Sequence, residues 1–291
     1  MQKIILYYIF TPVIDPQAVR LWQIASCKSL NLRGRILLST HGINGTLGGE
    51  VSDLNKYCQE LKNYAGFKDI IFKWGNGGYD DFPKLSVRVR DEIVSFGASA
   101  ELQVDSRGVV GGGTHLSPEA VHELVAERGD EVVFFDGRNA YEAQVGKFKN
   151  AVVSDAKTSK DFLQELSTTK YDNLKHRPVI TYCTGGIRCE ILSSLMINRG
   201  FTDVYQIDGG IVNYGRKYAD EGLWEGSLYM FNGQMGVKFS DKAKDIGVCV
   251  HCAGKTSRNT NCSIKTCDEL VVICGNCSSI TVCKTCQSLK I

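Results

Sequence analysis

The stretch PVITYCTGGIRCE, residues 178–190, decides the fold of the central part of the chain. Its first five residues are a largely apolar run with the length of a buried strand. A cysteine, two glycines and an arginine follow, and residues 190–197 have the composition of an apolar helix. The stretch therefore predicts a strand that ends at Tyr182, a tight loop that begins with Cys183, and a helix that begins near Arg188.

The residues on both sides of this stretch repeat the same alternation. Strands are expected at residues 131–135, 151–153 and 204–207, and helices from Ser117 to about Arg128, at residues 159–166, and from Arg188 to Gly200. Strands that alternate with helices predict a parallel sheet with helices on both faces. Ligands bind such sheets beyond the carboxyl ends of the strands, which is where Cys183 is expected.

The position of Cys183 predicts a reactive thiol. Unpaired N–H groups at a helix N-terminus carry partial positive charge and Arg188 adds a full charge, so both favour thiolate over thiol. The loop backbone consists of Thr184, Gly185, Gly186 and Ile187. Its two glycines allow successive N–H groups to face whatever the sulfur carries. The alternative is a small buried core cysteine, the ordinary role of this residue type.

The spacing between Cys183 and Arg188 indicates what the loop holds. Cysteine-dependent phosphatases use Cys-x5-Arg, a ring wide enough for phosphate, whereas this chain has Cys-x4-Arg. The tighter ring favours a single added sulfur or oxygen atom over a tetrahedral phosphate. Cys189 has two interpretations: a second thiol that resolves an oxidised or persulfidated Cys183, or a packing residue.

The first 110 residues predict a different arrangement. Strands are expected at residues 3–10, 33–40 and 70–74, helices from Asp15-Pro16 to about Asn31 and at residues 52–64, and a tight turn at residues 41–45 that leads into residues 46–48. Asp15 is a suitable N-cap and Pro16 suits the first helical turn. The order βαββαβ predicts a ferredoxin-like domain.

Residues 84–90, KLSVRVR, predict one more strand behind this domain because apolar and polar residues alternate strictly. Leu85, Val87 and Val89 are expected on one face of the strand. Lys84, Arg88 and Arg90 are expected on the other face with Ser86. One interpretation is a half-buried strand with a solvated polar face; the other is a basic ribbon that contacts nucleic-acid phosphates.

The end of the chain is rich in cysteine: eight of the 12 cysteines lie in the last 43 residues. They are Cys249, Cys252, Cys262, Cys267, Cys274, Cys277, Cys283 and Cys286. Three pairs have the Cys-x2-Cys spacing of tetrahedral thiolate ligation, and eight thiolates suffice for two zinc ions. The spacing leaves open whether the two sites are sequential or interleaved. Iron–sulfur ligation and disulfides are the alternatives, and His251 is expected to be an exposed bystander.

The composition excludes several classes of protein. A hydrophobic content of 43% and a charged content of 23% are those of a globular chain, and no segment approaches 18 apolar residues, the length needed to span a membrane. The N-terminus lacks a signal-peptide cleavage site, so a cytoplasmic location with reduced cysteines is expected. The expected domains are residues 1–110, 111–222 and 223–291. The middle one has a formal charge of −3, so bulk charge does not draw a polyanion to it.

Several motifs resemble a known family. Residues 136–146, DGRNAYEAQVG, resemble the rhodanese signature, and residues 200–211 resemble the segment that closes that fold. The motifs THGINGTLGG, FPKLSVRVRDEIVSFG, CTGGIRCE, QIDGGI and LWEGSLYMFN occur in this order. Together they resemble the oxygen-dependent tRNA uridine(34) hydroxylases, formerly called rhodanese-related sulfurtransferases, over nearly the whole chain.

The resemblance implies an enzyme that converts the wobble uridine of tRNA to 5-hydroxyuridine with O2 as co-substrate. It matches Cys183 to the cysteine that carries a persulfide. Asp136, Arg138 and Glu142 are expected to support the loop structurally. A tRNA substrate also favours the RNA-binding interpretation of Lys84, Arg88 and Arg90. The source of reducing equivalents and the sulfur or electron donor are left open.

Two other functions are compatible with the sequence. A sulfurtransferase that passes persulfide sulfur to a small molecule or a protein would explain Cys183, but it gives the flanking domains no task. A non-catalytic, zinc-stabilised binding module would not need the intact cysteine and arginine. The leading interpretation is therefore the RNA-modifying enzyme.

Overall fold

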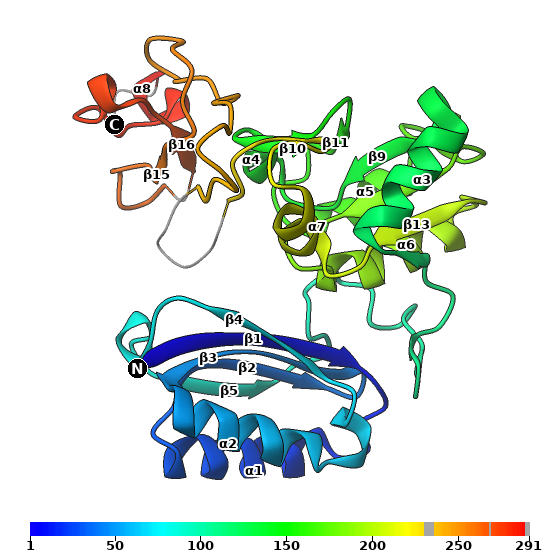
Figure 1. Ribbon diagram of the computed structural model, residues 1–291, viewed down its shortest axis with the longest axis vertical. Coiled ribbons are helices and arrows are strands. Elements are labelled where there is room, and N and C mark those ends of the chain that lie inside the picture. Colours follow the sequence, from blue (N-terminus) through cyan, green and yellow to red (C-terminus); the bar gives the residue numbers. More distant parts are fainter. Residues whose placement is uncertain (230–235, 268, 289–291) are drawn as a thin grey trace. The chain divides into compact units, whose positions relative to one another are not determined.

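The computed structural model describes residues 1–229, 236–267 and 269–288. They form two compact units, Met1–Gly112 and Gly113–Ile291 (Figure 1). The last residues of the motif LWEGSLYMFN, from Met230 onward, lie outside the described residues. No helix in the described part of the chain is long and apolar enough to span a membrane.

The first unit is the expected ferredoxin-like domain with one strand added to its main sheet and a separate two-stranded sheet. Its elements are β1 (Gln2–Phe10), α1 (Pro16–Ser29), β2 (Arg33–Ser39), β3 (Gly42–Glu50), α2 (Val51–Lys62), β4 (Ile71–Gly75), β5 (Leu85–Val89), β6 (Val104–Asp105) and β7 (Gly108–Val109). The main sheet has the order β4-β1-β3-β2-β5, and α1 and α2 cover one of its faces (Figure 1). Asp15 caps α1 as predicted, because its carboxylate accepts the N–H groups of Gln17 and Ala18 at 2.9 Å.

The expected turn at residues 41–45 is wrong, because β3 already begins at Gly42 and only Thr40 and His41 connect it to β2. The glycines of this segment serve close packing within the sheet. A Cβ atom on Gly45 would lie 2.2 Å from the ring of Tyr7, and one on Gly48 would lie 2.2 Å from the carbonyl oxygen of Gly78. Sequence reasoning assigned Gly42 and Gly45 to a turn because glycine is commonest there.

Strand β5 has the predicted alternation. It pairs in parallel with β2, and Val87 lies in the hydrophobic core with Leu85 and Val89 packed against that core. Lys84 and Arg88 are exposed. Because the sheet order places β5 at an edge, one side of its backbone does not pair with another strand.

The second unit contains the predicted parallel sheet, with the order β11-β9-β12-β13-β8. Its elements are β8 (Thr114–Leu116), α3 (Pro118–Arg128), β9 (Val133–Asp136), α4 (Ala140–Ala143), β10 (Gly146–Phe148), β11 (Val152–Val153), α5 (Asp161–Leu166), β12 (Val179–Tyr182), α6 (Ile187–Asn198), β13 (Val204–Ile207), α7 (Gly210–Tyr218) and β14 (Trp224–Gly226). The two central strands, β9 and β12, are fully buried, which explains why they read as continuous apolar runs.

The cysteine-rich tail adds three short elements to this unit, β15 (Asn259–Asn261), β16 (Leu270–Val272) and α8 (Lys284–Ser288). Strands β15 and β16 form an antiparallel pair. Val272 packs with Val145 and Tyr229 in a small hydrophobic cluster, which attaches the tail to the segment that follows α4. Among the described residues of the tail, a hydrophobic cluster of its own forms around the cysteines.

Candidate functional site

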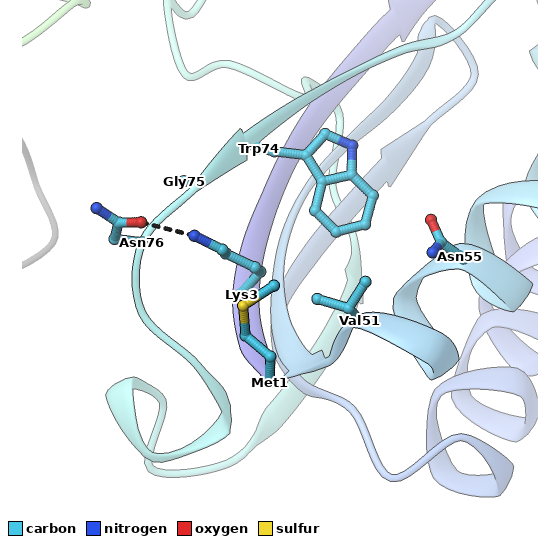
Figure 2. Close-up of a pocket in the computed structure, with 7 residues that line it drawn as sticks. All are labelled: Met1, Lys3, Val51, Asn55, Trp74, Gly75 and Asn76. Atoms are coloured by element: carbon cyan, nitrogen blue, oxygen red, sulfur yellow. Dashed lines mark hydrogen bonds between the residues drawn. The ribbon is translucent and has the colours of Figure 1, made fainter.

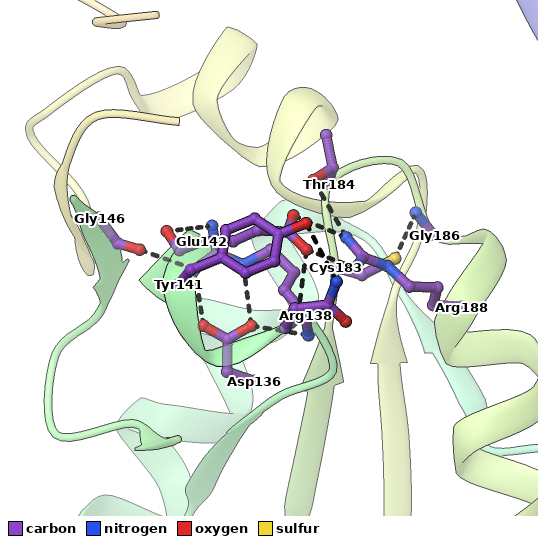
Figure 3. Close-up of polar contacts among 10 residues, drawn as sticks. Asp136, Arg138, Tyr141, Glu142, Gly146, Cys183, Thr184, Gly186 and Arg188 are labelled. Atoms are coloured by element: carbon purple, nitrogen blue, oxygen red, sulfur yellow. Dashed lines mark hydrogen bonds and ion pairs between the residues drawn. The ribbon is translucent and has the colours of Figure 1, made fainter. Parts of the chain in front are cut away.

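Cys183 lies where the sequence predicted it, directly after β12 and in the loop that leads into α6. Gly186 has a φ of +98°, a conformation that residues with a Cβ rarely adopt, and it lets the chain fold back over the sulfur. The backbone N–H of Gly186 donates to the Cys183 sulfur at 3.2 Å (Figure 3). The side chain of Cys183 is only 1% exposed, so the loop encloses it.

The loop lowers the pKa of the Cys183 thiol to about 5. Burial acts in the opposite direction and would raise the pKa. A hydrogen bond from the Cys189 thiol, the charge of Arg188 and hydrogen bonds from the backbone of both residues together outweigh it. Cys183 is therefore a thiolate at neutral pH, as the sequence predicted from a helix N-terminus and a nearby arginine.

The Arg188 side chain is held in place by a carboxylate, that of Glu142, rather than by the Cys183 sulfur. Its guanidinium forms a two-pronged ion pair with Glu142, with N–O distances of 2.6 and 2.9 Å (Figure 3). The Glu142 side chain is fully buried and that of Arg188 is 10% exposed. Burial alone would raise the pKa of Glu142, but the charge of Arg188 lowers it below its usual value. The pair fixes the cation beside the thiolate.

A second buried ion pair lies behind the first. Arg138 donates to both carboxylate oxygens of Asp136, at 2.8 and 2.6 Å, and to the carbonyl of Gly146 at 2.7 Å. The Tyr182 hydroxyl donates to Asp136 at 2.8 Å and so joins the end of β12 to the end of β9. Both charged side chains are inaccessible to solvent. Their contacts hold strand ends and the α4–β10 segment together, which is the supporting position expected for them.

Helix α7 contacts the loop in a way that sequence reasoning missed. The N–H groups of Ile211 and Val212 donate to the carbonyls of Cys183 and Thr184 at 2.9 and 3.1 Å. A Cβ atom on Gly210 would lie 2.4 Å from the Cys183 carbonyl oxygen, so only glycine permits this approach. The glycine pair in QIDGGI was the available signal, but a glycine pair is more typical of a turn than of a helix start.

Cys189 is the first-turn neighbour of Arg188 in α6 and is as buried as Cys183. Burial raises the pKa of its thiol, and the hydrogen bond to the Cys183 thiolate raises it further. It therefore stays protonated, and its S–H group donates a hydrogen bond to the Cys183 thiolate. The contact between the two sulfur-bearing side chains is compatible with both interpretations of Cys189, as a resolving thiol and as a packing residue.

The eight tail cysteines form two groups with the donor set of a metal site. One group is Cys249, Cys252, Cys274 and Cys277, and the other is Cys262, Cys267, Cys283 and Cys286. Within each group the sulfur atoms lie within 4.8 Å of one another. A tetrahedral site with metal–sulfur bonds of about 2.3 Å requires sulfur atoms about 3.8 Å apart. The sulfur atoms of Cys252 and Cys274 are 3.5 Å apart, and those of Cys267 and Cys283 are 3.7 Å apart. These distances fit a tetrahedral metal ion at each site.

The two groups are interleaved along the chain, which settles the question that the spacing left open. Each site takes one cysteine pair from before and one from after a pair of the other site. His251 belongs to neither group, and its Nε2 atom lies 2.7 Å from the carbonyl oxygen of Ile280. Because each site joins distant segments, a bound metal would cross-link the whole tail.

The three cations predicted for RNA binding do not share one environment. Lys84 and Arg88 line a hollow between β5 and α1, whose other cations are Arg20 and Lys28. Arg90 lies one residue beyond β5, where its Nη1 atom donates to the carbonyl of Val89 at 2.9 Å, and it does not line this hollow. Sequence reasoning missed the two helix cations because nothing in the sequence shows which helix packs beside β5.

Comparison with known proteins identifies all three regions. Residues 2–93 match the family described as UPF0176 acylphosphatase like domain, residues 117–217 the Rhodanese-like domain, and residues 225–288 the Rhodanase C-terminal family. A protein named tRNA uridine(34) hydroxylase from Corynebacterium glutamicum (strain R) is 62% identical over 94% of this chain and 88% of its own length. A protein of the same name from Arthrobacter sp. (strain FB24) is 60% identical over 96% of this chain and 95% of its own length. The chain therefore belongs to the tRNA uridine(34) hydroxylase family.

Proposed function

We propose that this protein hydroxylates C5 of the wobble uridine of tRNA in an O2-dependent reaction, with Cys183 as the catalytic nucleophile. The name shared by relatives that are 58–62% identical over nearly the whole chain supports the substrate and the reaction. One observation carries the role of Cys183. It is a buried thiol whose pKa is lowered to about 5 at the carboxyl edge of the parallel sheet.

Each residue of the loop has a separate task in this proposal. Arg188 stabilises the thiolate by its charge, and the backbone of residues 184–187 surrounds the sulfur. Glu142 positions Arg188, since it pairs with both guanidinium nitrogens that face it. Asp136 and Arg138 hold the ends of the strands beneath the loop and do not touch the sulfur.

The chemistry of uracil gives the thiolate a role. The Cys183 thiolate adds to C6, forming a C6–S bond and moving the C5–C6 π electrons onto C5 and O4. C5 then attacks an oxygen donor derived from O2. Loss of the C5 proton restores the C5–C6 double bond and expels the thiolate. One oxygen atom of O2 enters the base and the other leaves as water, so an external reductant supplies two electrons.

Two measurements test this proposal. Purified protein supplied with tRNA, O2 and reductant should add one oxygen atom, about 16 Da, to uridine 34. Mass spectrometry of tRNA digests measures this change, and the Cys183→Ser variant should add no oxygen. Without O2, the intermediate should take a solvent proton at C5 instead. The wild-type protein should therefore exchange the C5 hydrogen for deuterium, and the serine variant should not. Full hydroxylation by Cys183→Ser would overturn the assignment.

The rhodanese-like loop favours one alternative, a sulfurtransferase in which Cys183 carries a persulfide. The short ring between Cys183 and Arg188 and its inward N–H group suit a single additional sulfur atom. In that reaction the thiolate takes the outer sulfur of a donor such as thiosulfate and releases sulfite. Thiosulfate-dependent transfer to cyanide, combined with unmodified uridine 34, would support this function instead of hydroxylation.

We also propose that the two cysteine groups of the tail bind zinc. Four thiolates around each site suit Zn²⁺, and the metal would stabilise the tail without taking part in the reaction. Protein purified without chelators should contain about two zinc ions per chain by elemental analysis. Iron in place of zinc, or no metal, would contradict the assignment.

The proposal divides the tasks among residues 1–110, which bind the RNA, residues 111–222, which carry the reaction, and residues 223–291, which form the zinc-stabilised tail. Because tRNA is the proposed substrate, we also propose a cytoplasmic location. Fractionation of cells and limited proteolysis at the two boundaries test the location and the division.

A further inference from the structure

A hollow of about 410 Å³ lies between α1 and the edge strand β5 in the first unit. Residues of both elements line it: Arg20, Ile24, Lys28, Lys84, Leu85, Ser86, Val87 and Arg88. The three helix residues are spaced four apart, so they lie on one face of α1. The hollow therefore has one wall from a helix and one from a strand, and each wall carries two cations.

The positive charge in this hollow is not balanced by acidic residues of its own walls. Neither α1 nor β5 contains an aspartate or a glutamate. In the part of the chain that the structure describes, none of the four cations forms an ion pair with a carboxylate, whereas Lys56 and Lys68 of the same unit do. Four cations around one small hollow repel one another, so an anion that enters it is attracted to all four.

One cation is already held in place. The Nε atom of Arg20 donates to the carbonyl oxygen of Val87 at 3.1 Å, which fixes the guanidinium against the edge of β5. Guanidinium has five N–H donors, so four remain for another acceptor. A fixed arginine loses less conformational freedom when it binds a phosphate than a free one does.

The two walls match in length. Arg20 and Lys28 are eight helical residues apart, about 12 Å at 1.5 Å per residue. Lys84 and Arg88 are four strand residues apart, about 13 Å at 3.3 Å per residue. Two rows of cations of about the same length, one on each wall, suit an extended polyanion better than they suit a single small anion.

We propose that this hollow, the α1–β5 groove, binds the phosphate backbone of the tRNA. The inference rests on the proposed function, because it takes tRNA as the substrate. The charge of the part that carries Cys183 supports it: residues 111–222 carry a net charge of −3, so a surface outside these residues must attract the RNA. Protection of an exposed sheet edge also uses cations on a strand, but it does not require the two cations of α1.

The opposite edge of the same sheet offers a matched control. A hollow of about 490 Å³ lies beside β4 and is lined by Met1, Lys3, Val51, Asn55, Trp74, Gly75 and Asn76. Lys3 is its one charged side chain, and its Nζ atom donates to the Asn76 side-chain oxygen at 2.8 Å (Figure 2). Lys3→Gln therefore removes one charge from the same domain, at a hollow whose other cation, the N-terminal ammonium group of Met1, already pairs with Glu50 at 2.7 Å.

The test measures the affinity of the full-length protein for tRNA as a function of salt. Each lost phosphate contact lowers the slope of log K against log salt by about 0.7–0.9, so replacing Arg20, Lys28, Lys84 and Arg88 with glutamine should lower it by about 3. The affinity in moderate salt should fall by about 10-fold or more. Lys3→Gln should keep both values. If the fourfold variant does not fold, the exposed residues Lys28, Lys84 and Arg88 are replaced alone, with an expected change of about 2.

Variants of Arg90 distinguish binding in the groove from binding to a simple row of cations along the strand. Such a row predicts that Arg90→Gln and Arg88→Gln weaken tRNA binding equally. The groove predicts a clearly larger loss for Arg88→Gln, and also a loss for Lys28→Gln, which lies on no strand. Equal losses for the two arginines with no loss for Lys28→Gln would overturn the groove.

The outcomes distinguish this inference from the proposed function. If the wild-type protein hydroxylates tRNA and the fourfold variant binds tRNA with an unchanged salt slope, the groove is wrong and the function stands. If the wild-type protein does not modify tRNA, the proposed function fails. The groove then stands only if the salt slope of tRNA binding still depends on its four cations, and it fails if the slope does not. Unfolding curves and alkylation of Cys183 by a small reagent check that the variants keep their fold.

Discussion

Two cysteines of this chain are equally buried and chemically opposite. Cys27 in α1 is 0% exposed and Cys183 is 1% exposed. Burial raises the pKa of Cys27 to about 12, and the charge of Glu60 raises it further, whereas the pKa of Cys183 is lowered to about 5. Burial alone therefore does not make a thiol reactive. Hydrogen-bond donors directed at the sulfur and a fixed cation beside it do.

The largest effect expected from this comparison is in the reaction with alkylating reagents. Because its pKa is lowered, Cys183 stays a thiolate from pH 9 down to about 5 and loses reactivity only as the pH falls through that value. Cys27 stays a thiol until the pH approaches about 12 and should not react at neutral pH. Mass spectrometry of labelled peptides across this range measures both residues in one sample. Half-reaction of Cys183 near the ordinary thiol value of about 8.5 would contradict the contrast.

Removing the cation should make the pKa of Cys183 more like that of Cys27. Arg188→Met with Glu142→Gln removes both partners of the ion pair, so no buried charge is left without a partner. The pKa of Cys183 should rise toward its ordinary value, because the charge of Arg188 is one of the causes that lower it. The midpoint of the alkylation profile measures the shift, and hydroxylation at neutral pH should fall with the thiolate fraction.

Arg188→Met alone is the comparison variant for this pair. It leaves the fully buried Glu142 without its partner and should cost about 3–5 kcal/mol of stability in thermal or urea unfolding, whereas the double variant should cost less. An unchanged alkylation midpoint in a folded double variant would mean that Arg188 only supports the loop.

The Cys183 loop and the contacts that support it differ in how much of each the sequence could predict. The Cys183 loop is local: strand, cysteine, glycines and arginine are adjacent, so its position and its low pKa followed from residues 178–190. The Glu142–Arg188 pair and the contact of Gly210 with Cys183 join residues 46 and 27 positions apart. Spacing along the chain does not contain such contacts, and the resemblance supplied Glu142 only as a supporting residue.

The same limit applies to the fold. The order of strands and helices predicted the ferredoxin-like and parallel sheets, since the longer elements have either a periodic pattern or a continuous apolar run. Short elements were missed: β8 has three residues and α4 four, too few for a pattern. The interleaving of the tail cysteines and the partner of β5 are tertiary facts, because equal spacings permit several pairings.

The tail cysteines provide a third environment and a smaller expected effect on the reactive site. Cys249→Ser should remove one of the two metal ions per chain and destabilise the tail, because it deletes one ligand of an interleaved site. The alkylation midpoint of Cys183 should not change, since none of its causes comes from the tail. Elemental analysis and the pH profile of Cys183 check both parts. A shifted midpoint would show that the tail acts on the loop.

The last prediction concerns the Cys189 thiol, whose hydrogen bond comes first among the causes that lower the pKa of Cys183. Cys189→Ala removes this hydrogen bond, so the pKa of Cys183 should rise, whereas Cys189→Ser keeps an O–H donor and should preserve most of the shift. Both changes preserve Arg188 and the backbone donors, so Cys183 in both variants should remain more reactive than Cys27 at neutral pH.

The two variants also separate the interpretations of Cys189. A resolving thiol requires sulfur, so serine and alanine should both trap an oxidised or persulfidated Cys183, detected by intact mass after turnover. A packing residue predicts no trapped species in either variant and a difference between them only in the alkylation midpoint.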